Sequence, residues 1–137
     1  MVSAHRYPRR VQFAETDLAG MVHFSWYLRY VEEAEHALWR AAGLSIHDPS
    51  SGVGFPRVAF SIEYHAPLHF EDEFEVDIRI EALSTKTIRY RSVVRRADEA
   101  VASSTHTAVC VERGVEPMKA VPLPDAIRER LAAAGAS

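Results

Sequence analysis

The pattern of hydrophobic and polar residues divides the chain into one long helical segment and several strands. Between about His23 and Ala42, apolar residues recur every three or four positions, which is the spacing of one face of an α-helix. These residues are Phe24, Tyr27, Leu28, Val31, Leu38 and Ala41. A second apolar stripe at Trp26, Tyr30 and Ala37 indicates that the helix is covered on more than one side. Gly43 is suitably placed to end the helix.

Strands are indicated by a two-residue period, in which apolar side chains point to one face and polar side chains to the other. The period is clearest between Glu73 and Glu81, and it is repeated from Ile88 to Val94. Further strands are predicted from His5 to Ala14, around Phe60 to Tyr64, and from Val101 to Val111. Short polar segments separate the last three strands of the chain, and they predict antiparallel hairpins.

The order of elements is therefore a strand, a long helix and four antiparallel strands, with a short helix from about Pro124. One face of such a sheet is apolar and needs cover, which only the segment from His23 to Ala42 is large enough to provide. This predicts an α+β fold, in which a five-stranded antiparallel sheet wraps around one long central helix. The 137 residues contain no internal repeat and no linker, so we expect a single domain over residues 1–137.

Composition narrows the classes of partner and the cellular location. The formal net charge of -3 argues against nucleic acid as a general partner, since a binder would show a basic stripe. The single cysteine, Cys110, excludes an internal disulfide and fits a reducing compartment. No apolar run approaches the ~20 residues of a membrane span, and the first residues lack the apolar core of a signal peptide. We therefore expect a cytoplasmic protein that binds neither nucleic acid nor a membrane.

A lone carboxylate, Asp17, stands just ahead of the helix, with Gly20 in the same turn. Aspartate is common at this position because it caps helices and forms turns. Alternatively, Asp17 faces something bound at the start of the helix, where the first backbone N–H groups lack partners and the helix dipole adds positive potential.

The segment ETDLAGMVHFSWYLRYVEEAE, from Glu15 to Glu35, resembles the motif of the 4-hydroxybenzoyl-CoA thioesterase family, which has the hot-dog fold. The matching positions are Asp17, Gly20, Val22, Tyr27, Leu28, Tyr30 and Glu33. The likeness continues from Phe55 to Val76 and from Glu116 to Leu131, and so covers nearly the whole chain. It departs at Phe24, where many members have histidine or tyrosine, and at Trp26, where many have asparagine or serine.

This resemblance implies an acyl-CoA thioesterase that needs no cofactor, because coenzyme A is part of the substrate. Thioester hydrolysis passes through an oxyanion, which backbone N–H groups near His23 and Phe24 would hold. Asp17 would then be the catalytic residue, either as the nucleophile or as a general base that activates water. Substrate contacts are expected from Gly20, Val22, His23, Phe24, Tyr27 and Lys86.

Lys86 is the preferred contact for the phosphates of coenzyme A, because it falls near the basic cluster that family members use for the nucleotide. Nearby arginines are better explained by ion pairs with the acidic strand from Glu73 to Glu81. These arginines are Arg89, Arg91, Arg95 and Arg96. Some relatives of the fold use a carboxylate on the helix, so Glu33 is a second candidate, although a solvated or interface glutamate is the simpler explanation. His65 and His69 have no evident third ligand, so we expect no metal site.

Two other functions stay open. Hot-dog dehydratases and hydratases use an aspartate and a histidine five residues apart with an asparagine between them. Here Val22 is five residues after Asp17, His23 is six residues after it, and the chain contains no asparagine. The second alternative is a non-catalytic protein that binds acyl groups.

We also expect a homodimer that assembles further into a homotetramer. The apolar stripe at Trp26, Tyr30 and Ala37 is more than one sheet can cover, and an open edge strand would be an aggregation liability. Hot-dog relatives join their sheets in pairs and build the active site at the subunit interface. The resemblance therefore implies that Asp17 of one chain faces pocket residues of another.

Overall fold

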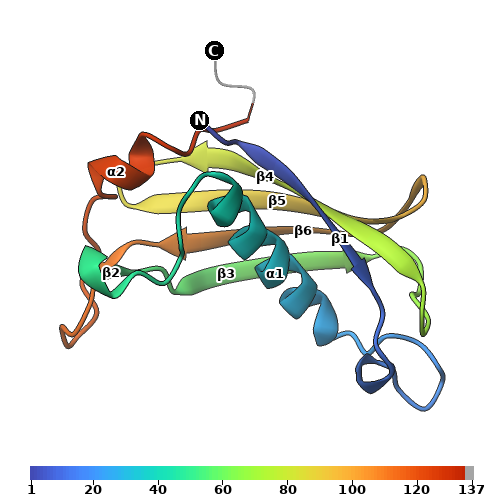
Figure 1. The fold of residues 1–137 in the computed structure, drawn as a ribbon. Coiled ribbons are helices and arrows are strands. Elements are labelled where there is room, and N and C mark those ends of the chain that lie inside the picture. The colour runs from blue at the N-terminus through green and yellow to red at the C-terminus, as the bar shows by residue number, and fades with distance from the viewer. Residues whose placement is uncertain (135–137) are drawn as a thin grey trace.

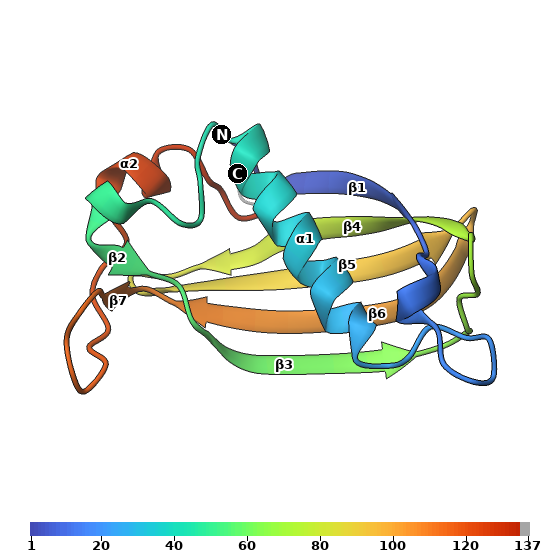
Figure 2. The same cartoon turned by 60° about the horizontal axis from the view of Figure 1, so that its bottom comes forward.

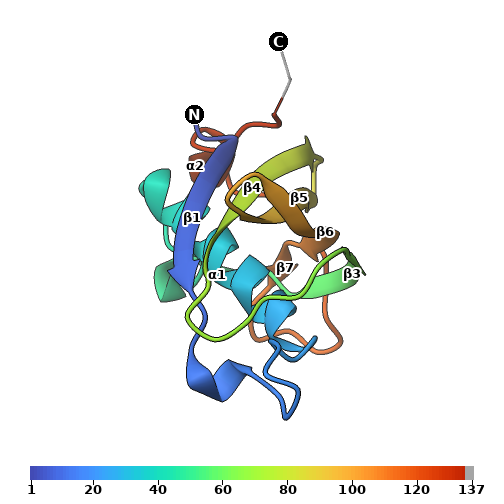
Figure 3. The same cartoon turned by 90° about the vertical axis from the view of Figure 1, so that its right-hand side faces the viewer.

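Residues 1–134, which the computed structural model describes, form a curved sheet around one long helix. The strands of this sheet are β1 (Ala4–Arg10), β3 (Arg57–Tyr64), β4 (Glu73–Leu83), β5 (Thr87–Arg96) and β6 (Glu99–Val109). They lie in the order β1-β4-β5-β6-β3, and all neighbours are antiparallel. Helix α1 (Trp26–Ala41) crosses one face of the sheet (Figures 1 and 2), and the sheet curves around it (Figure 3). The predicted α+β architecture is confirmed.

The two-residue period explains which face of the sheet meets the helix. In β4, the buried side chains alternate with polar ones, as the sequence predicts. The buried members are Phe74, Val76, Ile78 and Ile80. On the outer face, Arg89 pairs with Glu81 at 2.6 Å and Arg95 pairs with Asp77 at 3.0 Å. These ion pairs confirm the explanation favoured for Arg89 and Arg95, whereas Arg96 pairs with Asp72 and Glu99, outside the acidic strand.

Helix α1 begins at Trp26, three residues later than the periodicity predicts. His23 and Phe24 lie in a turn whose carbonyl groups accept the N–H groups of Trp26 and Tyr27, at 3.0 and 3.4 Å. The side chains of this turn keep the spacing of the helix, although their backbone is not helical, and this explains why the periodicity predicts an earlier start. At the other end, Gly43 adopts a φ of 78°, the left-handed conformation expected of a residue that ends a helix.

Two further segments differ from the predictions. Strand β1 ends at Arg10, and the residues expected to extend it form a 3₁₀ helix, η1 (Phe13–Glu15). The predicted loop from Ser45 to Pro56 contains η2 (Pro49–Ser51) and β2 (Val53–Gly54), which pairs with β7 (Val111–Glu112). These segments are too short to show a period in the sequence. The short C-terminal helix is α2 (Asp125–Arg128), close to its predicted start. None of the helices in residues 1–134 is long and apolar enough to cross a membrane.

Two of the three residues in the second apolar stripe of α1 are buried within the chain. Tyr30 is fully buried, and its ring lies 4.7 Å from that of Phe74 and 4.7 Å from the Arg9 guanidinium of β1. Ala37 is 7% exposed. Strand β1 packs beside α1 (Figure 3). Trp26, the third member of the stripe, is only partly buried, so its cover by a partner subunit stays a prediction. Exposed apolar side chains occur instead before and within the first turn of α1 and along β3. They are Phe24, Leu28, Val58 and Tyr64.

Candidate active site

The segment from Thr16 to Val22, here called the Asp17 loop, closes on itself. Its two end residues form an isolated β-bridge, and the Asp17 N–H donates to the Met21 carbonyl at 2.8 Å. Inside the loop, the Gly20 N–H donates to the Asp17 carbonyl at 3.0 Å. Gly20 has a φ of 82°, which other residues rarely adopt, and this explains why a glycine follows the aspartate.

Only one of the two carboxylate oxygens of Asp17 accepts hydrogen bonds from the loop. Its Oδ1 accepts the N–H of Ala19 at 2.9 Å and that of Met21 at 3.3 Å. Its Oδ2 has no hydrogen-bond partner among residues 1–134, and the side chain is exposed. Asp17 is therefore a turn former, as the simpler explanation states, and it also carries a fixed carboxylate oxygen that can meet a ligand.

Just ahead of α1, one backbone N–H is left without an acceptor. The His23 N–H donates to the Glu15 carbonyl at 2.9 Å, and the Ser25 N–H lies 3.4 Å from the His23 Nδ1. The Phe24 N–H has no acceptor in the part of the chain that the structure describes. Of the two N–H groups expected to hold an oxyanion, that of His23 is already occupied in closing the loop, and that of Phe24 remains.

The other predicted contacts separate into buried and exposed residues. Val22 and Tyr27 are buried, and the Tyr27 ring packs edge-on against Tyr64 at 5.0 Å, so both support the loop and the helix from within. Burial raises the pKa of Tyr27. His23 is exposed, with its ring 4.5 Å from that of Phe24 and its Nδ1 2.8 Å from the Ser25 Oγ.

Lys86 lies at the opposite end of the sheet from Asp17. It stands in the turn before β5, where β4 ends, whereas the Asp17 loop pairs with His69, shortly before β4 begins (Figure 1). The 11 residues of β4, at about 3.3 Å per residue, span about 36 Å. The structure therefore does not bring Lys86 to the Asp17 of its own chain.

Asp17 borders a shallow hollow with an apolar lining. Phe13, Leu18 and Phe70 line this hollow together with Gly20, and all three apolar side chains are exposed. The rings of Phe13 and Phe70 meet edge to face at 5.6 Å. Exposed aromatic side chains beside a free carboxylate oxygen form a surface suited to an apolar ligand or a second subunit.

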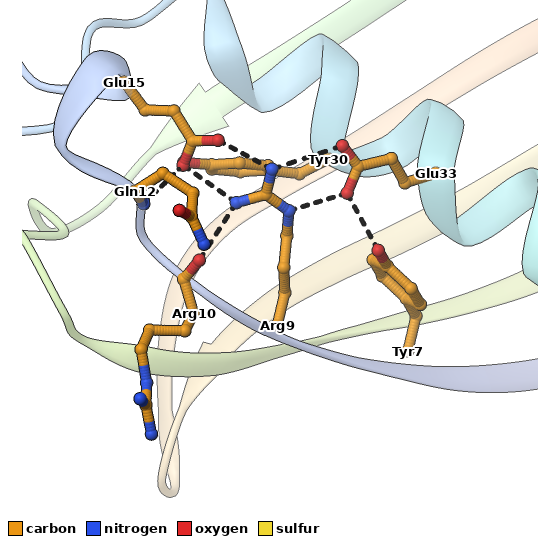
Figure 4. A network of polar contacts seen from close by, with 7 residues as sticks. All are labelled: Tyr7, Arg9, Arg10, Gln12, Glu15, Tyr30 and Glu33. Atoms are coloured by element: carbon orange, nitrogen blue, oxygen red, sulfur yellow. Dashed lines mark hydrogen bonds and ion pairs between the residues drawn. The ribbon is translucent and has the colours of Figure 1, made fainter.

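A polar network beneath the Asp17 loop, here called the Arg9 network, was not predicted from the sequence (Figure 4). Arg9 donates to both oxygens of Glu15, at 2.8 and 2.6 Å, and to Glu33 at 2.7 Å. The Tyr30 hydroxyl donates to Glu15 at 2.7 Å, and the Tyr7 hydroxyl donates to Glu33 at 2.9 Å. Glu33 is thus held by two residues of β1 in a partly buried ion pair within the chain, which differs from the solvated or interface glutamate given as the simpler explanation. The available signal was the strand period, which places Arg9 on the apolar face of β1.

The charges of this network shift the pKa values of its members. Burial of Glu15 opposes its ionisation, but Arg9, the Gln12 N–H and the Tyr30 hydroxyl together hold its pKa below the usual range. Burial and the neighbouring Glu15 raise the pKa of Tyr30. At neutral pH the network is therefore an ion pair with a neutral tyrosine.

A second buried polar group, here called the Glu35 cluster, lies on the other side of α1. Glu35 is fully buried and accepts a hydrogen bond from Arg57 of β3. Its other oxygen lies 3.2 Å from the Nε2 of His106 of β6, whose ring stacks on Tyr90 at 4.6 Å. Burial opposes the ionisation of Glu35, but His106 and Arg57 hold its pKa below the usual range.

The histidines considered for a metal have other partners. The Nε2 of His65 lies 2.7 Å from the Ser103 Oγ, and the Nδ1 of His69 lies 3.8 Å from Asp72. No group of three or more histidine, cysteine or acidic side chains among the described residues is arranged to hold a metal ion.

Comparison with known proteins places the fold in a family. Residues 11–131 match the thioesterase-like superfamily. The structure of a hypothetical protein from Aquifex aeolicus is similar with a TM-score of 0.87 and 36% identity, covering 93% of this chain and 99% of that chain. The structure of a 1,4-dihydroxy-2-naphthoyl-CoA thioesterase from Synechocystis has a TM-score of 0.84 and 28% identity, covering 93% and 94%. A 1,4-dihydroxy-2-naphthoyl-CoA hydrolase of Microcystis aeruginosa is 28% identical over 127 residues, or 91% of each protein.

These relationships confirm two predictions from the sequence. The neighbours share the hot-dog arrangement of a long helix held in an antiparallel sheet. The expected class of enzyme, a thioester hydrolase, is confirmed at the level of the family. The chain belongs to the thioesterase-like superfamily.

Proposed function

We propose that this protein hydrolyses acyl-CoA thioesters with Asp17 as the catalytic residue and the Phe24 N–H as the oxyanion donor. One observation carries the proposal: the Asp17 loop and the turn before α1 together present a free carboxylate oxygen and a free backbone N–H. The two groups belong to one continuous segment, and the Glu15 carbonyl, which holds His23, joins the base of the loop to that turn.

The chemistry follows from these two groups. The Phe24 N–H donates to the thioester carbonyl oxygen and stabilises the negative charge that develops on it, and one such donor is worth about 3 kcal/mol. As a nucleophile, the Asp17 Oδ2 attacks the carbonyl carbon, the thiolate of coenzyme A leaves, and water then hydrolyses the acyl-aspartate anhydride to the free acid. As a general base, it removes a proton from the water that attacks the carbonyl carbon, and this proton goes to the thiolate that leaves. This mechanism uses a carboxylate and a backbone N–H, and requires no cofactor beyond the substrate.

We propose further that the site is completed by a second copy of the chain in a homodimer, and that dimers pair into a tetramer. Support comes from β3, an eight-residue strand at the edge of the sheet, and from the exposed Phe24, Val58 and Tyr64 near it. Pairing of two β3 edges would cover these side chains and remove the open edge. Lys86 would then serve the Asp17 of another protomer.

The acyl group that the enzyme prefers can be identified by measuring hydrolysis of a panel of acyl-CoA thioesters. Two relatives are named for 1,4-dihydroxy-2-naphthoyl-CoA, and the hollow beside Asp17 is lined by Phe13 and Phe70. We therefore expect aromatic acyl-CoA esters to be hydrolysed with a higher kcat/KM than straight-chain esters. Release of free thiol, followed with a thiol reagent, measures both. A protein without activity on any ester of the panel, but with affinity for them, would support the non-catalytic alternative.

A further inference from the structure

We propose that Arg9, Glu15 and Tyr30 are positioning residues, which set the geometry of the Asp17 loop against the Phe24 N–H. This inference rests on the proposed function. None of the three side chains is assigned a contact with the substrate, and each acts through the backbone of the loop.

Glu15 is held by residues of β1 and α1 and by the backbone just ahead of η1. Arg9 of β1 donates to its two carboxylate oxygens at 2.8 and 2.6 Å, Tyr30 of α1 donates at 2.7 Å, and the Gln12 N–H donates at 2.9 Å (Figure 4). The Glu15 residue is only 2% exposed. A carboxylate with four such donors has a single position relative to both the strand and the helix.

The backbone of Glu15 transmits this position to both reacting groups. Its carbonyl accepts the His23 N–H at 2.9 Å, which fixes the residue directly before Phe24. Its chain continues into Thr16, which bridges to Val22, and then into Asp17. The tip of the loop, from Leu18 to Gly20, is exposed, so the base of the loop decides where the carboxylate lies.

A structural role alone explains this network poorly. Burying a carboxylate and a guanidinium costs desolvation that their attraction roughly offsets, and apolar side chains of similar volume often give equal stability. What an ion pair with directed hydrogen bonds adds is a defined geometry. A displacement of about 1 Å at a reacting group can lower a rate roughly a hundredfold, so such geometry has a measurable consequence.

The test compares two tyrosines of the same network. Tyr30→Phe removes the hydroxyl bonded to Glu15, whereas Tyr7→Phe removes one bonded to Glu33, at the far end from the Asp17 loop. We expect Tyr30→Phe to lower kcat about tenfold with little change in KM, and Tyr7→Phe to leave kcat unchanged. Equal losses of kcat in both variants, or no loss in Tyr30→Phe, would overturn the inference.

Amide hydrogen exchange gives a readout that does not depend on activity. The Asp17 N–H, which is bonded across the loop, should exchange faster in Tyr30→Phe and at the wild-type rate in Tyr7→Phe. Unchanged exchange in both variants contradicts positioning even if hydrolysis is slow. The proposed function is judged separately, by Asp17→Asn, so the two ideas can fail independently.

The link to Asp17 is tested by a double variant. Glu15→Gln keeps the shape of the side chain but removes the charge that binds Arg9. If Glu15 acts through Asp17, Glu15→Gln should lower kcat at least tenfold in the wild type and by less than twofold in an Asp17→Asn background. Equal factors in the two backgrounds would show that Glu15 acts by another route.

Discussion

The Arg9 network and the Glu35 cluster hold the same helix with the same chemistry on opposite sides. Glu33 and Glu35 are two residues apart on α1, and Glu33 meets Arg9 of β1 while Glu35 meets Arg57 of β3 and His106 of β6. Both groups pair a carboxylate of α1 with an arginine of the sheet, and in both a carboxylate has a lowered pKa.

The difference lies in what each group is attached to. The Arg9 network includes Glu15, whose backbone leads into the Asp17 loop. Arg57 and His106 of the Glu35 cluster lie within the regular strands β3 and β6, and neither residue leads directly into the Asp17 loop. Under the proposed function, a buried ion pair affects catalysis where it anchors a segment that carries a reacting group. Otherwise it fixes how the helix packs on the sheet.

The largest effect is expected at the site itself. Asp17→Asn keeps an oxygen that can accept the N–H groups of Ala19 and Met21, so the loop should fold, but it removes the base or nucleophile. We expect kcat to fall roughly 10²- to 10⁴-fold without a change in melting temperature. Thiol release and thermal unfolding measure the two quantities.

A matched control is Asp48→Asn, because Asp48 holds a turn in the same way through the Ser50 N–H at 3.0 Å, outside the candidate site. This variant should retain full activity. An Asp17→Asn enzyme with near-normal kcat would remove Asp17 from the mechanism. A loss of folded Asp17→Asn protein would show that the loop depends on the charge, and Asp17→Ser would then be measured instead.

The second largest effect is expected in the Glu35 cluster, on the other side of the helix, where a substitution should change stability rather than catalysis. Glu35→Gln leaves Arg57 with only the partly exposed Glu32, at 3.1 Å, and takes the carboxylate away from the buried His106. Removing one member of a buried pair costs about 3 kcal/mol or more. We expect the free energy of unfolding in urea to fall by this amount while kcat of the folded enzyme stays within twofold of wild type. A large loss of kcat in folded Glu35→Gln would contradict the claim that, of the two groups, only the Arg9 network affects catalysis.

Much of this architecture follows from the sequence because its signals are local. The period of β4, β5 and β6 and the aromatic spacing of α1 each lie within one segment, so they predict the sheet and the helix that crosses it. The start of α1 was misplaced because the aromatic rings of the preceding turn keep the helical spacing. The His23 N–H that closes the loop leaves no trace in that pattern.

The two polar groups were not predictable in the same way. Glu35 and His106 are 71 residues apart, and Arg9 and Glu33 are 24 apart, so each pair depends on how strands and helix are placed in space. A single charged residue on an apolar face, such as Arg9 or Glu35, indicates a partner without identifying it. Asp17 became a candidate because it stands just ahead of the helix, and the family resemblance strengthened it. The resemblance also included Tyr30, but no signal in the sequence connected Tyr30 with Arg9 and Glu15.

Acid should lower the free energy of unfolding through both the Arg9 network and the Glu35 cluster. The loss should be smaller than that caused by Glu35→Gln. The pKa values of Glu15 and Glu35 are lowered in the folded state. Each carboxylate therefore stabilises the fold fully above the unfolded glutamate value of about 4.3, and this contribution is lost as the pH falls through the folded pKa. We expect the free energy of unfolding to decline from about pH 5 to about pH 3, and less steeply in Glu15→Gln and in Glu35→Gln. Slopes equal to that of wild type would contradict the lowered pKa values.

The smallest effect is expected from an exposed charge that belongs to neither group. Lys86 lies at the other end of the sheet from the Asp17 of its own chain, so it can act on hydrolysis only through another protomer. An exposed ion pair contributes at most about 1 kcal/mol, so Lys86→Ala should raise KM for an acyl-CoA ester about two- to fivefold. KM for the same acyl group on a pantetheine without the nucleotide should not change. Lys119→Ala, at the other lysine of the chain, is the control and should leave both KM values unchanged. Equal increases for the two substrates in Lys86→Ala would remove the phosphate contact, and with it this evidence for a site shared between protomers.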